Sequence, residues 1–153
     1  MKRTLVALLL IFSVLGVGTA RADDPIHMPT VISGPVQADV VSVYDGDTFT
    51  VLAYPWPGVV MHVSVRLMGL DAPEIRGKCQ FEKDKAQEAK ALTIANAGTH
   101  VVLKNIRHDK YAGRVLADAY TTDGQSLADL LIAAGLARPY DGGKREPWCT
   151  GQQ

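Results

Sequence analysis

Apolar and polar positions divide the chain into strand-like and helix-like stretches. Residues 38–44 are rich in valine, and apolar and polar residues alternate over 48–54 and again over 59–68, as on strands with one buried face. Asp45-Gly46 separates the first two runs and is a strong hairpin signal. A turn at 55–58, with two prolines and a glycine, separates the second run from the third. The pattern therefore predicts three successive antiparallel strands.

The second half of the chain predicts two further strands with a helix on either side of them. Residues 81–97 place charged side chains around an alanine-rich face, and Gly98 follows, which favours a helix that ends there. Residues 101–106 and 115–121 are strand-like, and 126–134 form a short apolar helix. We therefore expect an α+β fold, a five-stranded OB-type β-barrel with a helix after strand 3 and a helix after strand 5. The open face and loops of such barrels commonly bind nucleic acids or sugars.

The first 22 residues have the pattern of a secretory signal peptide. Lys2 and Arg3 precede an apolar run at 5–18, and residues 20–22 (ARA) form a small-residue cleavage site. An uncleaved membrane anchor is the alternative, but the run falls short of the roughly 20 residues that a bilayer-spanning helix needs. We therefore expect cleavage after Ala22 and a protein that is secreted or periplasmic, without membrane association.

The rest of the chain predicts one domain. Residues 23–36 include three prolines and are expected to be a flexible leader, and 37–153 form the barrel domain, because 153 residues with 47% hydrophobic content supply one sizeable core. The formal net charge is zero over the whole chain, but residues 1–22 hold basic residues and no acidic one. The exported protein is therefore slightly acidic, whereas a protein that binds nucleic acid through its overall field is expected to be basic.

Two cysteines, Cys79 and Cys149, have no neighbouring Cys or His at zinc-site spacing. In an oxidising compartment we expect one disulfide that ties the tail to the middle of the chain. Closing so long a loop contributes about 4 kcal/mol in the chain-entropy model. Two unpaired thiols remain the alternative.

Two acidic motifs stand at the ends of predicted strands. Residues 45–48 (DGDT) lie at the start of strand 2, and residues 71–74 (DAPE) follow strand 3, with Arg66 shortly before them. Either motif alone is most often a turn with solvated acids, but adjacent strands of a barrel can bring both to one end. Asp47 and Asp71 would then supply hard carboxylate oxygens, which select Ca²⁺ or Mg²⁺.

These motifs resemble those of the staphylococcal (micrococcal) nuclease family. The similarity runs from about residue 40 to residue 137. It depends on four segments in order: 43–48 (VYDGDT), 66–67 (RL), 71–74 (DAPE) and 111–114 (YAGR). The resemblance implies a calcium-dependent enzyme that cleaves DNA and RNA. Its calcium ligands would be Asp47, Asp71 and the backbone carbonyl of Ala72.

The resemblance also implies catalytic roles. Glu74 matches the family's catalytic glutamate, described as a general base or as the group that positions the attacking water. Arg66 and Arg114 match the two arginines that hold the scissile phosphate. These charges suit the task, because a phosphodiester gains negative charge as water attacks, and a planar guanidinium group meets two phosphate oxygens at once. Asp45 and Thr48 would fix the loop or hydrogen-bond metal-bound waters.

Other parts of the chain depart from the family pattern. Tyr111 and Tyr140 are candidates for contact with a phosphate or a base, with packing as the alternative role for each. After residue 137 the family's aromatic pair and third helix are missing. We expect a Cys79–Cys149 disulfide to anchor the tail in place of that helix.

We therefore expect an exported, calcium-dependent endonuclease of little sequence specificity, acting on DNA and RNA as a monomer without a stable protein partner. A non-catalytic nucleic-acid-binding module of the same fold is the first alternative. A protein in which calcium is purely structural is the second. The combination of three carboxylates with two arginines favours the enzyme, because a pure binding module needs no such set.

Overall fold

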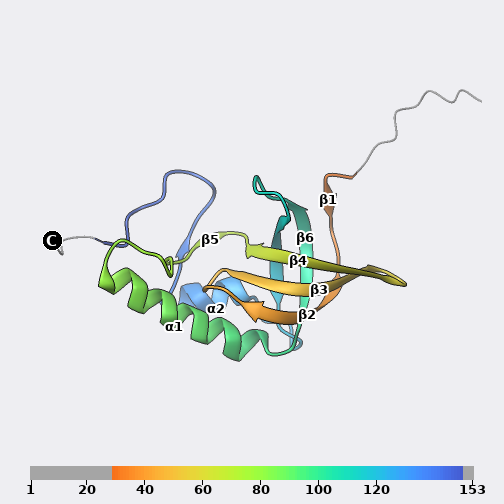
Figure 1. Ribbon diagram of the computed structural model, residues 1–153, viewed down its shortest axis with the longest axis horizontal. Coiled ribbons are helices and arrows are strands. Elements are labelled where there is room, and N and C mark those ends of the chain that lie inside the picture. The colour runs from red at the N-terminus through yellow and green to blue at the C-terminus, as the bar shows by residue number, and fades with distance from the viewer. Residues whose placement is uncertain (1–28, 150–153) are drawn as a thin grey trace, which may run out of the picture.

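The computed structural model describes residues 29–149, a β-barrel with two helices packed against it (Figure 1). The predicted signal peptide at 1–22 lies outside the described residues. The predicted leader is described only from Pro29 onward, and there it contains a short strand, β1 (Val31–Ile32), which pairs with β6. None of the helices within 29–149 has the length and apolarity needed to cross a membrane.

Five strands close the barrel: β2 (Val36–Val43), β3 (Thr48–Trp56), β4 (Val59–Leu67), β6 (His100–His108) and β7 (Arg114–Tyr120). They pair in the order β6-β2-β3-β4-β7, and β7 also pairs with β6. The β4–β7 pairing is parallel and the other four are antiparallel. Helix α1 (Gln80–Ala97) precedes β6, and α2 (Leu127–Ala133) follows β7. The predicted barrel and the position of both helices are therefore confirmed.

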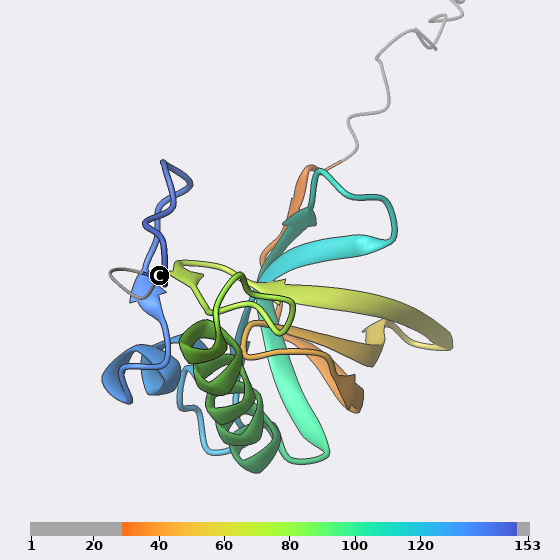
Figure 2. The same cartoon turned by 60° about the vertical axis from the view of Figure 1, so that its left-hand side comes forward.

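A second, small sheet lies beside the barrel. It consists of β5 (Leu70–Asp71) and β8 (Arg138–Pro139), with Asp71 opposite Arg138. Each strand has two residues, which is too short for the alternation by which strands are predicted. This sheet ties the tail after α2 to the segment that follows β4 (Figure 2).

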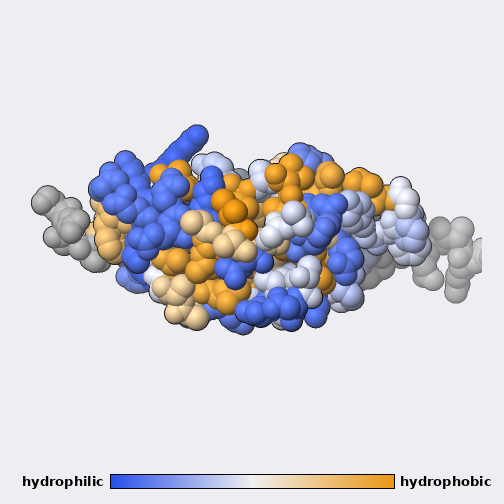
Figure 3. Space-filling model, turned by 90° about the horizontal axis from the view of Figure 1, so that it is seen from below, coloured by the Kyte–Doolittle hydropathy of each residue, from blue (hydrophilic) through white to orange (hydrophobic). Residues whose placement is uncertain are grey.

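The core is made of inward-facing strand residues covered by the helices. Phe49, Val65 and Leu103 from the barrel are fully buried, as are Leu127 and Leu131 from α2. The outer surface is mixed, and on the face in Figure 3 apolar and hydrophilic residues are interspersed, as is usual for protein surfaces.

Helix α1 packs closely on the barrel because its buried face is made of small residues. Ala89 is fully buried, and a Cβ added to Gly46 would lie 2.6 Å from its Cβ atom. One turn further along, the Thr93 hydroxyl donates a 2.7 Å hydrogen bond to the Gly46 carbonyl. The turn between β2 and β3, which carries Asp45 and Asp47, is therefore held directly against the helix.

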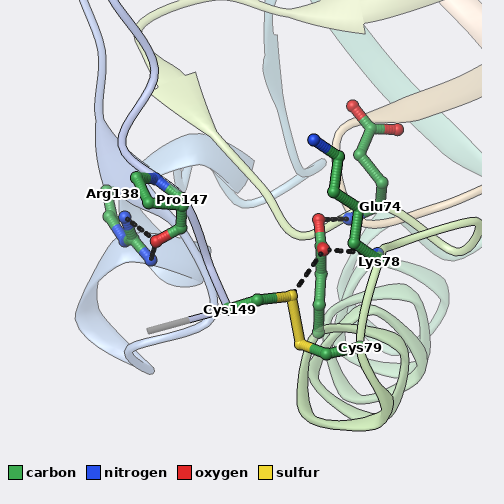
Figure 4. The surroundings of a disulfide bond; sticks show 7 residues. Glu74, Lys78, Cys79, Arg138, Pro147 and Cys149 are labelled. Atoms are coloured by element: carbon green, nitrogen blue, oxygen red, sulfur yellow. Dashed lines mark hydrogen bonds between the residues drawn. A yellow bond between two sulfur atoms is a disulfide. The ribbon is translucent and has the colours of Figure 1, made fainter. Parts of the chain in front are cut away.

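The tail is fastened to the start of α1. A disulfide joins Cys79, the residue before the helix, to Cys149, and Arg138 donates to the Pro147 carbonyl (Figure 4). The Arg138 guanidinium also stacks on the Trp148 ring, 3.7 Å from its centroid. We call residues 138–149 the tail strap.

Replacing Thr93 with valine tests whether α1 holds the acidic turn. The change keeps the side-chain shape but leaves the buried Gly46 carbonyl without its donor, so we expect a loss of about 1–3 kcal/mol in the free energy of unfolding. Urea denaturation measures it. The matched control is Thr122→Val at an exposed position, which should change stability by less than about 0.5 kcal/mol. Equal stability of the two variants would show that the hydrogen bond does not hold the turn.

Candidate active site

The acidic turn between β2 and β3 is locked by its own hydrogen bonds. The Asp47 amide donates to Asp45 Oδ1 at 3.2 Å, and the Thr48 hydroxyl donates to Asp47 Oδ1 at 2.7 Å. The Asp47 carbonyl accepts from the Leu67 amide at the end of β4. All three polar residues of the turn are buried, so their side chains are held in place before any ligand arrives.

Arg66 comes from β4, directly opposite Thr48 in the strand register. Its Nη2 atom lies 2.7 Å from Asp47 Oδ2, and the arginine side chain is only 12% exposed. Nη2 is buried and, within residues 29–149, makes no well-directed hydrogen bond, so its contact with Asp47 is an ion pair alone. A buried guanidinium group thus lies beside the acidic turn, and it has N–H donors available for a ligand.

The DAPE motif brings two further carboxylates to the same end of the barrel. Asp71, in β5, is buried, and Glu74 is half-exposed just after it. The Glu74 amide faces Glu82 Oε1 at 3.5 Å, and Glu82 Oε2 accepts from the Lys78 amide at 2.9 Å. Glu82 therefore holds the loop that carries Glu74, although its place in a charged helical stretch indicates an exposed residue.

Arg114 lies at the start of β7. It is paired with Asp109, and its guanidinium carbon lies 4.7 Å from the Tyr111 ring centroid. The loop between β6 and β7, which carries Asp109 and Tyr111, thus contacts the arginine from two sides. Burial acts to raise the pKa of Asp109, but its hydrogen bonds from Arg114 and from the Lys110 amide lower it overall.

These side chains converge on one open cavity of about 660 Å³. Seven of the residues predicted from sequence line it: Asp45, Thr48, Arg66, Glu74, Tyr111, Arg114 and Tyr140. A second cavity, of about 340 Å³, shares Glu74 with the first and is lined by Asp71 and Ala72. Asp47 reaches the group through its ion pair with Arg66. The structure therefore brings together every predicted metal, catalytic and substrate-contact residue.

Two residues of the tail strap that were not predicted from the sequence, Arg145 and Trp148, also enter the site. Arg145 Nε lies 3.1 Å from Asp71 Oδ1, and its Nη1 donates to Glu74 Oε1 at 3.0 Å. The Trp148 indole donates to Asp71 Oδ2 at 3.3 Å. In the sequence these residues are separated from the acids by more than seventy positions. Only the nearby Cys149, as the disulfide partner of Cys79, indicates that this segment folds back toward the acids.

Burial sets the protonation of the acids. It raises the pKa of Asp47 to about 7 against the opposing charge of Arg66, and it raises the pKa of Asp45 as well. It also raises the pKa of Asp71, where Arg145 acts in the opposite direction and Asp47 adds to the increase. For Arg145, burial acts to lower the pKa, but the charge of Asp71 together with the charge and hydrogen bond of Glu74 and the charge of Asp47 raises it overall. The ionised acids therefore need a cation close by.

The residues present fit a hard divalent cation. Asp47 and Asp71 offer buried carboxylate oxygens, and the Ala72 carbonyl and Glu74 follow Asp71 within three residues. Such oxygen atoms are the ligands that Ca²⁺ takes. Four carboxylates gather here with only two paired guanidinium groups, those of Arg66 and Arg145. With all four acids ionised, the formal charge of this group is −2, which a divalent ion would neutralise.

A second group of potential ligands is explained without a metal. Cys79, Glu82 and Cys149 lie close together, but both sulfurs are in the disulfide. A disulfide sulfur is not the thiolate that binds metals.

Comparison with known proteins gives one family match and two relatives. The model of the family described as staphylococcal nuclease homologue matches residues 64–149. An uncharacterized endonuclease of Escherichia coli is 30% identical over 117 residues, which cover 76% of this chain and 69% of that protein. An uncharacterized endonuclease of Escherichia coli O157:H7 matches to the same extent.

The matched range includes most residues of the site and both cysteines of the disulfide: Arg66, Asp71, Ala72, Glu74, Cys79, Tyr111, Arg114, Tyr140, Arg145 and Cys149. The resemblance drawn from the four short motifs is thus confirmed by a comparison that covers more than half of the chain. The chain belongs to the staphylococcal nuclease homologue family.

Proposed function

We propose that this protein is an exported, calcium-dependent endonuclease that hydrolyses phosphodiester bonds of DNA and RNA with little sequence specificity. The observation that carries the proposal is the convergence of Arg66, Glu74 and Arg114 on one cavity beside the buried acids Asp47 and Asp71. The family and its endonuclease relatives support the same reaction class.

Two arginines would bind the phosphate. Arg66 and Arg114 reach the cavity from β4 and β7, which are neighbouring parallel strands. Negative charge that develops on the phosphoryl oxygens would lie between donors already held by Asp47 and Asp109. Such preorganised donors stabilise the transition state of the reaction more than they stabilise the bound substrate.

Glu74 would orient the attacking water and accept its proton. Its carboxylate is half-exposed at the cavity wall, so it can accept a hydrogen bond from water and then its proton. Asp47, Asp71 and the Ala72 carbonyl would hold Ca²⁺. When bound, the ion supplies positive charge to the phosphate and orients water.

Substrate contacts and cellular location complete the proposal. Tyr111 and Tyr140 line the cavity, where an aromatic ring can stack on a base of any type. This mode of contact supports low sequence selectivity. The signal-like pattern of residues 1–22 supports export, and the disulfide supports an oxidising compartment.

The first test is degradation of heat-denatured DNA and of RNA by the purified protein. With Ca²⁺ we expect internal cleavage of both polymers, and with a chelator in excess we expect none. Gel electrophoresis separates the outcomes. A shifted but uncut band in the presence of Ca²⁺ would contradict the enzyme and support a binding module.

The second test assigns the chemistry to the cavity. Glu74→Gln keeps the side-chain shape but removes the base, so we expect kcat to fall about 10²–10⁴-fold. Arg114→Ala removes one phosphate donor, for which we expect a loss of about 10²–10³-fold. Glu88→Gln and Arg107→Ala, at exposed positions outside the lining of both cavities, are the matched controls and should retain activity. Full activity of Glu74→Gln or Arg114→Ala would remove that residue from the mechanism.

A further inference from the structure

Arg145 occupies the place between two acids that the proposed reaction needs. One guanidinium group contacts Asp71 Oδ1 at 3.1 Å and Glu74 Oε1 at 3.0 Å. Asp71 is a proposed metal ligand and Glu74 is the proposed base. In this arrangement positive charge is already supplied to both carboxylates by the protein itself.

The tail strap holds the backbone just after Arg145, where Arg138 donates to the Glu146 and Pro147 carbonyls, but it leaves the Arg145 side chain partly exposed. At one end the strap is held by the β5–β8 pairing and by the Tyr140 amide, which donates to the Gly69 carbonyl at 3.0 Å. At the other end it is held by the Cys79–Cys149 disulfide. Residues 141–147 between these anchors are exposed, and the Arg145 side chain is 42% exposed.

Arg145 can therefore leave the acids while the anchors stay in place. It lines both the 340 Å³ and the 660 Å³ cavities, so an alternative position toward the phosphate-binding side is open to it. Tyr140 lines the larger cavity, with its ring centroid 5.7 Å from the Arg145 guanidinium carbon.

A divalent ion and Arg145 cannot both keep full contact with Asp71. Two cations on one carboxylate repel each other at close range. A guanidinium bound to Glu74 Oε1 also occupies one of the two oxygens with which that carboxylate would accept a proton from water. Contact of Arg145 with both acids and full coordination of a divalent ion by Asp71 are consequently alternatives.

We propose that Arg145 is an internal cation that competes with Ca²⁺ for Asp71 and Glu74. It neutralises these acids while the metal is absent, and it gives them up when the metal binds. This inference depends on the proposed function, because it takes Ca²⁺ as the competing ion. When a ligand must displace an internal group, its apparent Kd equals the intrinsic Kd divided by the fraction of molecules in which the site is open.

Isothermal titration calorimetry with CaCl₂ as the only added ligand tests the competition. Arg145→Gln should lower the Kd for Ca²⁺ about fivefold or more, the low end of the range for linked sites. Arg145→Lys keeps the charge but cannot contact both carboxylates at once, so its Kd should lie between those of Arg145→Gln and the unchanged protein. Circular dichroism confirms that each variant is folded.

The matched control is Arg76→Gln, which removes the same charge from an exposed arginine lining the 340 Å³ cavity. It measures the general electrostatic effect, which we expect to change Kd by less than about twofold. A Kd of Arg145→Gln equal to that of Arg76→Gln, or a weaker affinity, would overturn the competition and leave the calcium-dependent enzyme standing. No saturable Ca²⁺ binding by any of these proteins would overturn both.

Discussion

Buried negative charge is the constraint on which the rest of this structure depends. Asp45, Asp47 and Asp71 are all less than 5% exposed, and burial raises the pKa of each. An ionised acid in such a place is costly unless a cation compensates it. Arg66 and Arg145 compensate part of this negative charge, and a divalent ion can compensate the rest.

The fold brings the acids together through short connections held from several sides. One acidic turn is pressed against α1 through Gly46 and Thr93. The other acidic segment forms β5, and its loop is held by Glu82 and by the tail strap. Each carboxylate is therefore placed by packing around it, which is how a preorganised site is built. The disulfide also contributes, because it holds the tail strap, with Arg145 and Trp148, at the end of the barrel where the acids lie.

Much of this could be predicted from the sequence. Alternation over 48–54 and 59–68, the Asp45-Gly46 turn and the alanine-rich helical stretch predict the main elements, because strand and helix periods differ strongly. Strand ends meet at one end of a barrel, so the convergence of the two acidic motifs could also be expected. The strands β5 and β8 are too short to leave a periodic signal.

The parts that the sequence did not predict depend on tertiary contacts. Glu82 belongs to a run of charged residues but is buried, because the backbone amides of the neighbouring loop need an acceptor. Arg145 stands in a segment of glycines and charges that is typical of a solvated loop. Its contact with Asp71 and Glu74 arises only after the strap has crossed the end of the barrel, and no local pattern encodes that crossing.

The most direct measurement of the central claim is a crystal structure of the protein soaked in Ca²⁺, with the ion located by its anomalous scattering. We predict an anomalous peak about 2.3–2.6 Å from carboxylate oxygens of both Asp47 and Asp71, with Arg145 no longer bridging Asp71 and Glu74. At a saturating Ca²⁺ concentration, the absence of a peak at these acids, with Arg145 still in contact with both carboxylates, would contradict the account.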